Sequence, residues 1–519
     1  MHKEPSSSRE VKASMLVGVR WVAGARAISE AIGFGSTVVL ARLIAPPEFG
    51  RAVIALIVAG VATVLVTNAF ASLLVQQKEI DEDDVRAAVG LNVTIGLALS
   101  VIVLALAEPI STLTGGGSAG LIRAVSPVCF LAGINAVPAA MLSRRLDFRR
   151  LSFIGVLAQL IGVGAAVALA AGGAGAAAIV VGALVTQAAS TCASVMIFRP
   201  PLPRLHLEPL RRLISFGAPN AAGSLLFTGF QNVDYAVIGA RLGPTQLAYY
   251  YRAFQYGVGY QAKISQILAN MAFPVYSRLA SMDDVRAVRS RIVRVHAAVI
   301  FPLLAGYACL APTLIPWMLG ERWAPVVAPS QFMTVSGAVT AVLTGTGALM
   351  VAIGRPGLSL LWNLGHFVFF GLVVYVVAPL GIVTVAAVVA GFYLVQGLAA
   401  HWFLLRGAAG VPMRDLFSEL LGPCTACAAL AACAVPLRWL MARAGAPPVP
   451  TLLVAGAVGS LVYGVVMRYG FPAVWDDLEL LVRRLLQSEA AQVTPRGPSG
   501  TAVDSADVAG SRAGASQAA

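Results

Sequence analysis

The stretch that decides the fold is Ala41-Arg42-Leu43-Ile44-Ala45-Pro46-Pro47-Glu48-Phe49-Gly50, which ends one apolar run and opens the next. A looser copy follows near residues 239–250, and matching Pro46 to Pro244 gives an offset of 198 residues (244 − 46). Proline lacks a backbone donor and glycine tolerates unusual dihedral angles, so each copy suits a tight turn between two helices. The echo predicts two related halves, a pattern typical of secondary transporters whose substrate sites lie between repeats.

Composition places the chain in a membrane. Of its 519 residues, 58% are hydrophobic and only 12% are charged, and the mean hydropathy is +0.80. Soluble domains carry about a quarter charged residues, so a soluble fold is excluded. The net charge of +13 comes from basic residues that fall between apolar runs. This placement argues against a nucleic-acid partner and favours anchoring of loops in the cytoplasm.

The apolar runs set the fold class. Each run is long enough to cross a hydrocarbon core of about 30 Å, which needs roughly 20 residues per helix. The runs are 18–44, 50–75, 87–107, 121–142, 151–171, 176–198, 213–240, 253–277, 292–319, 327–353, 357–378, 382–405, 418–441 and 450–469. They predict an all-α polytopic protein of about fourteen transmembrane helices, with two six-helix lobes and two extra C-terminal helices.

The same pattern predicts five parts. Apolar residues recur at helical spacing from Trp475 to Leu486, which indicates a short amphipathic helix, and the composition after it indicates disorder. We expect a mobile tail at 1–13, an N-lobe at 14–198, a C-lobe at 199–405, helices 13 and 14 at 406–472, and the amphipathic helix with a disordered cytoplasmic tail at 473–519.

Arginine placement orients the chain, because cytoplasmic loops carry an excess of Lys and Arg. With the N-terminus inside, the fourth, sixth and eighth connections face the cytoplasm and are rich in arginine. Their arginines are Arg144, Arg145, Arg149, Arg150, Arg199, Arg204, Arg211, Arg212, Arg278, Arg286, Arg289, Arg291 and Arg294. The outer connections hold fewer, so we expect both termini in the cytoplasm.

Several short motifs carry a family resemblance. They are Gly18-Val19-Arg20-Trp21, Val39-Leu40-Ala41-Arg42-Leu43, Pro47-Glu48-Phe49-Gly50, Asn232-Val233-Asp234-Tyr235, Leu242-Gly243-Pro244 and Phe273-Pro274, with the basic run Arg144-Arg145-Leu146-Asp147-Phe148-Arg149. In this order they resemble the polysaccharide exporters of the multidrug/oligosaccharidyl-lipid/polysaccharide (MOP) flippase superfamily, in the Wzx and teichuronic acid exporter branch. The resemblance covers about residues 16–405, and the last two helices match only in number.

The resemblance implies two lobes around a cavity that opens to either side in turn. Members of the family move undecaprenyl-diphosphate-linked oligosaccharides across the bacterial cytoplasmic membrane, so the expected activity is transport, with no catalytic residue. Moving a charged, hydroxyl-rich head through hydrocarbon is costly, so a flippase needs a hydrated, cationic cavity. Arginine suits the diphosphate, because it stays charged and donates two parallel hydrogen bonds.

Ionisable residues inside the expected helices are the candidates for that cavity. In helix 1, Arg26 and Glu30 are four residues apart on one face. An intrahelical ion pair is one interpretation, and contact of Arg26 with the diphosphate is the other.

Helices 7 and 8 hold the other candidates, Gln231, Asn232, Asp234, Arg252, Gln255 and Lys263. This polar density is hard to place against lipid, so these faces are expected to line the cavity. Asp234 has two interpretations: an ion pair with Lys263, or a site for a coupling cation while Lys263 or Arg252 meets phosphate. For the tyrosine cluster from Tyr249 to Tyr260, an interfacial belt is favoured over stacking on sugar rings.

Three functions are weighed on this architecture. The favoured one is the flippase for a surface polysaccharide precursor; the alternatives are a multidrug or cation antiporter of MATE-like architecture and a flippase for lipid II. The expected partners are the lipid-linked oligosaccharide and membrane lipids, with a polysaccharide polymerase and other assembly proteins left open. We expect no metal site, since the CxxC at Cys424 and Cys427 has no second pair nearby, and no cofactor. Coupling to H⁺ or Na⁺ stays open.

Overall fold

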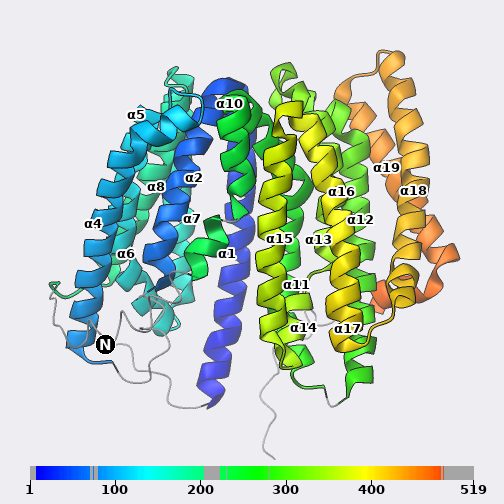
Figure 1. Cartoon of the computed structure of the whole chain (residues 1–519), viewed down its shortest axis with the longest axis horizontal. Coiled ribbons are helices and arrows are strands. Elements are labelled where there is room, and N and C mark those ends of the chain that lie inside the picture. Colours follow the sequence, from blue (N-terminus) through cyan, green and yellow to red (C-terminus); the bar gives the residue numbers. More distant parts are fainter. Residues whose placement is uncertain are drawn as a thin grey trace, which may run out of the picture.

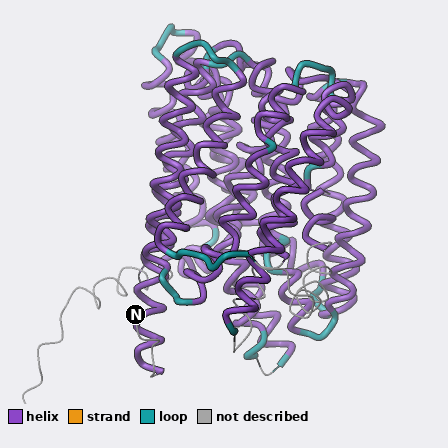
Figure 2. The backbone as a smooth tube through the Cα atoms, turned by 90° about the vertical axis from the view of Figure 1, so that its left-hand side faces the viewer, coloured by secondary structure: helices purple, strands orange, loops and turns teal. Residues whose placement is uncertain are grey.

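The computed structural model describes residues 8–69, 74, 80–203, 223–229, 231–279, 281–480 and 483. In that part of the chain every regular element is a helix and there is no strand. The helices run along one common axis and their connections gather at two ends, as Figures 1 and 2 show. Among the described residues, eleven helical stretches are long and apolar enough to cross a membrane. The chain is therefore an all-α, multi-pass membrane protein, and the count of fourteen spans stays a prediction.

The first half forms one group of helices, on the left of Figure 1. Two of its helices begin at an aspartate that accepts a backbone N–H three residues on, Asp81 from Asp84 and Asp147 from Arg150, which satisfies a donor that the helix leaves free. The helices are α1 (Ser8–Leu43), α2 (Pro46–Ala69), α4 (Glu82–Leu113), α5 (Ala119–Val125), α6 (Pro127–Arg144), α7 (Phe148–Ala171) and α8 (Ala176–Ile197). α1 starts before the apolar run expected at 18–44 and enters the segment expected as a mobile tail.

The second half contains more breaks than the sequence indicates. Its elements are α10 (Val233–Phe254), the π-helix η1 (Gln255–Gly259), α11 (Tyr260–Tyr276), α12 (Met282–Leu319), the 3₁₀-helix η2 (Glu321–Val326), α13 (Val327–Val342), α14 (Thr346–Ala352), α15 (Pro356–Val377), η3 (Ala378–Leu380), α16 (Ile382–Ala400), the π-helix η4 (His401–Arg406) and α17 (Gly407–Ala409). The gap expected at 241–252 is wrong, because this segment is helical except at Gly243, whose φ of 79° breaks α10 before Pro244. The eighth helix therefore begins at Pro244.

The last two helices are α18 (Met413–Arg443) and α19 (Pro448–Gly470), and both pack on α12. Arg289 and Glu419 join α12 to α18 by an ion pair of 3.4 Å in which both side chains are buried. Residues 472–480 form the start of the predicted amphipathic helix. It packs on α12, where Asp477 pairs with Arg291 at 2.9 Å and Arg294 at 3.2 Å. Val482 and Leu485 of the predicted apolar face lie outside the described residues.

The two ends of the molecule differ, and we name them by their residues. The end where the chain turns from α1 into α2 is the proline end, at the top of Figure 1, and the turn at Pro244 lies there too, because its backbone closely approaches Gly50. The end that carries the connection from Arg144 to Arg150 is the arginine end, at the bottom of the same view. α1 runs from the arginine end to the proline end and stands between the two groups of helices (Figure 1). The first and second copies of the turn therefore lie at the same end.

Candidate functional site

The site lies where α1 meets the eighth helix, residues 244–276, which comprises the second part of α10, η1 and α11. The two helices are antiparallel, so residues with increasing numbers in α1 contact residues with decreasing numbers in the eighth helix. The pairs are Glu30 with Lys263, Phe34 with Tyr260 at a ring distance of 5.9 Å, and Thr37 with Arg252. This ladder is a contact between the first and second halves of the chain.

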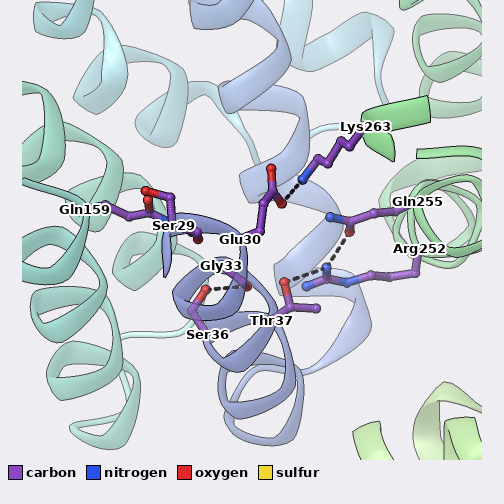
Figure 3. Close-up of polar contacts among 9 residues, drawn as sticks. All are labelled: Ser29, Glu30, Gly33, Ser36, Thr37, Gln159, Arg252, Gln255 and Lys263. Carbon is purple, nitrogen blue, oxygen red and sulfur yellow. Dashed lines mark hydrogen bonds and ion pairs between the residues drawn. The ribbon is translucent and has the colours of Figure 1, made fainter. Parts of the chain in front are cut away.

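The outermost pair of the ladder is an ion pair between the halves. Lys263 Nζ donates to Glu30 Oε2 at 2.5 Å, across the gap that Figure 3 shows. The two side chains are 42% and 39% exposed, and Lys263 also lies 5.3 Å from the centre of the Tyr260 ring. An ion pair this exposed contributes about 0–1 kcal/mol, because water screens it. An anion of higher charge can therefore displace Glu30 from Lys263 at little cost. The interpretation of Glu30 as the partner of Arg26 is not what the structure shows.

Arg252 lies deeper, in the seal between the halves. Its side chain is 3% exposed, and its Nη1 donates to Gln255 Oε1 at 2.8 Å and to Thr37 Oγ1 at 3.4 Å. The guanidinium lies over Phe49, 4.2 Å from the ring centre. In the described part of the chain no carboxylate pairs with it, so amide, hydroxyl and aromatic groups alone surround this cation. Such cation–π contacts are strongest where water is excluded.

Asp234 lies in the packed interior of the C-lobe. Its side chain is 1% exposed. Oδ2 accepts from the hydroxyl of Tyr250 at 3.1 Å and Oδ1 accepts from the backbone N–H of Tyr235 at 2.9 Å. The proposed pair with Lys263 is absent, since each of the two residues has another partner. In this conformation Asp234 is buried and lines neither of the two cavities described below.

The remaining candidates lie nearer to solvent. Arg26 is exposed, one helical turn from Glu30 on the same face of α1, and makes no ion pair within the described residues. Gln231 is exposed, and Asn232 is partly buried with its amide donating to Thr228 O at 2.8 Å. Arg26 and Lys263 are therefore the solvent-accessible cations near the Glu30–Lys263 pair of the ladder.

Two cavities of about 280 Å³ flank the ladder. The first lies between α1, the eighth helix and α12, and its walls include Phe34, Tyr256, Tyr260, Gln261 and Tyr307. The second lies between α2 and α10, with Asn232, Thr228 and Tyr251 among its lining residues. The linings are mainly aromatic and aliphatic, and the Nζ of Lys263 lies 5.3 Å from the ring of Tyr260, which lines the first cavity.

Sequence reasoning missed the residues that seal the proline end. Phe49 packs edge-on against Trp323 at 5.5 Å and lies 6.4 Å from Tyr251. Tyr250 and Tyr256 are buried, so an interfacial belt is the wrong interpretation of these two members of the cluster. Phe49 stands in the turn motif, and its large apolar side chain is the sequence feature that could have indicated a buried contact there. The chain from Pro244 onward continues as a helix, which would have placed the tyrosines inside it.

Comparisons with known proteins agree with this architecture. A family model described as a polysaccharide biosynthesis protein matches residues 39–328. The lipopolysaccharide biosynthesis protein WzxC of Escherichia coli is 26% identical, over 78% of this chain and 84% of its own. The succinoglycan biosynthesis transport protein ExoT of Rhizobium meliloti is 25% identical, over 90% and 94%.

Among solved structures, the lipid II flippase MurJ in an inward closed conformation has a similar fold, with a TM-score of 0.64 at 14% identity. The match covers 87% of this chain and 99% of that chain. This similarity concerns the fold alone. The family match covers more than half of the sequence and includes both proline turns, the Asp234 segment and the eighth helix. The chain therefore belongs to the polysaccharide biosynthesis protein family.

Proposed function

We propose that this protein is a flippase that translocates an undecaprenyl-diphosphate-linked oligosaccharide across the bacterial cytoplasmic membrane by alternating access, with both termini in the cytoplasm. The observation that carries the proposal is the partly exposed Lys263, which pairs weakly with Glu30 between the halves, while Arg26, one helical turn from Glu30, makes no ion pair within the described residues. A diphosphate meets these cations without breaking a strong contact. The names of the relatives, which refer to lipopolysaccharide and succinoglycan, support a surface polysaccharide as the cargo.

The two cavities suit the other parts of the cargo. Aromatic faces such as Tyr256 and Tyr260 offer surfaces for sugar rings, and apolar walls tolerate an isoprenoid tail. Rocking of the halves would expose the ladder to one end and then the other. No bond is made or broken, so the protein acts as a transporter and has no catalytic residue. The proposed site comprises Arg26, Glu30, Gln231, Asn232, Arg252, Gln255 and Lys263, with Asp234 as a buried residue that supports the eighth helix.

Deletion of the gene tests the proposal. We expect loss of a surface glycan together with accumulation of its lipid-linked precursor in the cytoplasmic membrane, and both should return to normal when the intact gene is restored. Loss of glycan without accumulated precursor would contradict the proposal, because it would place the block before translocation. Accumulation of lipid II in its place would support the peptidoglycan alternative.

A further inference from the structure

The ends of α1 and α12 exchange arginines across the proline end. Arg42, at the end of α1, donates to the carbonyl oxygens of Met318 at 3.0 Å and Trp317 at 2.5 Å, which end α12. Arg322, just after α12, donates to the carbonyl oxygens of Ala41 at 3.2 Å and of Arg42. The last carbonyls of a helix have no intrahelical partner and carry partial negative charge. Each half therefore satisfies the helix end of the other half.

Neither arginine relies on a carboxylate. Among the described residues, no ion pair includes Arg42 or Arg322. Trp323 adds a further bond, from its indole N–H to Ala41 O at 2.8 Å. All of these contacts join the two halves, so separation of the halves at this end would break them together.

The backbones of the two proline turns also approach each other closely at this end. A methyl group built on Gly50 would overlap the carbonyl oxygen of Pro244 and lie 2.5 Å from its carbonyl carbon. The obstacle is backbone and cannot rotate away, so the closed end leaves no room for a side chain at position 50. Gly115, in the connection after α4, also faces Pro244, whose Cδ would lie 3.2 Å from an added Cβ. The first proline turn thus carries a glycine where it touches the second.

We propose that Arg42, Arg322 and Gly50 set the resting conformation of the transporter by holding the proline end closed. The two arginines attract the halves to each other, because each donates to carbonyl oxygens of the other half that would otherwise bind water. Gly50 supplies the clearance, because only a residue without Cβ lets the two proline turns touch. This inference concerns the resting conformation and is measured without cargo, so it stands or falls separately from the proposed substrate.

Spin labels on the two halves test the proposal in the full-length protein in lipid nanodiscs, with the native cysteines replaced. Ala174 and Leu380 are exposed at the proline end, one in each half, and are suitable label positions. Gly50→Ala should shift the distance distribution to longer values, since separation of the turns relieves the overlap. Gly60→Ala is the matched control on the same helix, because no atom lies within 4 Å of its added Cβ.

A second variant keeps the test decisive if Gly50→Ala does not fold. Arg42→Met with Arg322→Met removes the caps without adding bulk and should also lengthen the distance. Arg241→Met is its control, since this arginine stacks on Tyr375, 4.1 Å from the ring centre and within the same half. A parent-like distribution in the folded double variant would overturn the proposal.

Discussion

At the scale of single residues, the ion pair between Lys263 and Glu30 has unequal partners. The pair is partly exposed and contributes little to stability, so we expect its importance to come from the positive charge that Lys263 places between the halves. In the proposed function, Glu30 neutralises Lys263 while the site is empty, and a diphosphate takes the place of Glu30. The two residues then differ in importance, although each is the other's only charged partner within the described residues.

Lys263→Gln should therefore lower export much more than Glu30→Gln. We expect a loss of about tenfold or more for Lys263→Gln, because a hydrogen bond to a charged group contributes about 1.5–3 kcal/mol. Glu30→Gln leaves the cation in place and should change export by less than about threefold. Surface glycan in a complemented deletion strain measures both, with protein levels checked by immunoblot. Equal losses would show that the pair itself, and not the cation, is required.

The carboxylate of Asp234 gives a prediction about stability. Tyr250→Phe removes the one side-chain donor to this buried carboxylate among the described residues, and leaving the carboxylate oxygen unsatisfied costs about 1–3 kcal/mol. We expect a clear fall in the melting temperature in detergent. Tyr249→Phe is the matched control, since its hydroxyl makes an exposed bond of 3.2 Å to Arg322 O. A Tyr250→Phe protein as stable as the Tyr249→Phe protein would show that Asp234 does not depend on the bond.

At the scale of elements, the π-helix η1 interrupts the eighth helix between Arg252 and Lys263. Single π turns often mark functional positions in helices. Here η1 packs against α13 through two glycines: a Cβ on Gly257 would overlap Met333, and a Cβ on Gly337 would overlap the carbonyl oxygen of Gly257. The close approach of α13 therefore fixes the wide turn and, with it, the direction in which the two cations point.

Gly257→Ala should loosen this packing. Overpacking of a tight contact costs about 1–3 kcal/mol, so we expect a lower melting temperature and weaker export. Gly259→Ala lies in the same turn, but its nearest neighbour would be Gln255 Cγ at 3.7 Å, an ordinary contact. The Gly259 variant should be close to the parent in both measurements. Similar losses in the two variants would mean that helical propensity, and not the contact with α13, is responsible.

At the scale of the whole molecule, the connections between helices fall into two sets, one at each end, and which end faces the cytoplasm stays a prediction. The connections between α6 and α7 and between α11 and α12 lie at the arginine end, and the turn between α1 and α2 lies at the proline end (Figure 1). The acidic residues Glu82, Asp83 and Asp84 open α4 at the arginine end, where they complement the positive end of the helix. Acidic residues weigh little in orientation, so this cluster is compatible with a cytoplasmic position.

Single cysteines in a protein without native cysteines should map this orientation. Ala174→Cys at the proline end should react in intact cells with a thiol reagent that does not cross the cytoplasmic membrane. Asp83→Cys, whose native side chain is 59% exposed, should react only after the cells are opened. The reverse pattern would place the arginine end outside and would contradict the proposed cytoplasmic position of both termini.

The sequence predicted the architecture better than the site. Long apolar runs and the two proline turns were sufficient for an all-α membrane protein, because hydrocarbon leaves few alternatives to helices. The segment after Pro244 was misinterpreted, because its polar and aromatic residues look like a loop until α1, α2 and α13 cover them. Lys263 and Glu30 were both chosen as candidates, but their partnership depends on how the halves meet, which no local pattern encodes. The side chain of Arg42 binds backbone carbonyl oxygens, which every residue has, so the sequence does not indicate its partners.

The attachment of the C-terminal region to α12 has a practical consequence. α18, α19 and residues 472–480 grip this helix through the buried pair of Arg289 with Glu419 and the two bonds of Asp477. We expect a fluorophore or a rigid fusion partner joined to residue 480 to move with α12. Paired with a second dye near Ala174, it would report the proposed rocking of the halves as a change in energy transfer, visible in individual molecules.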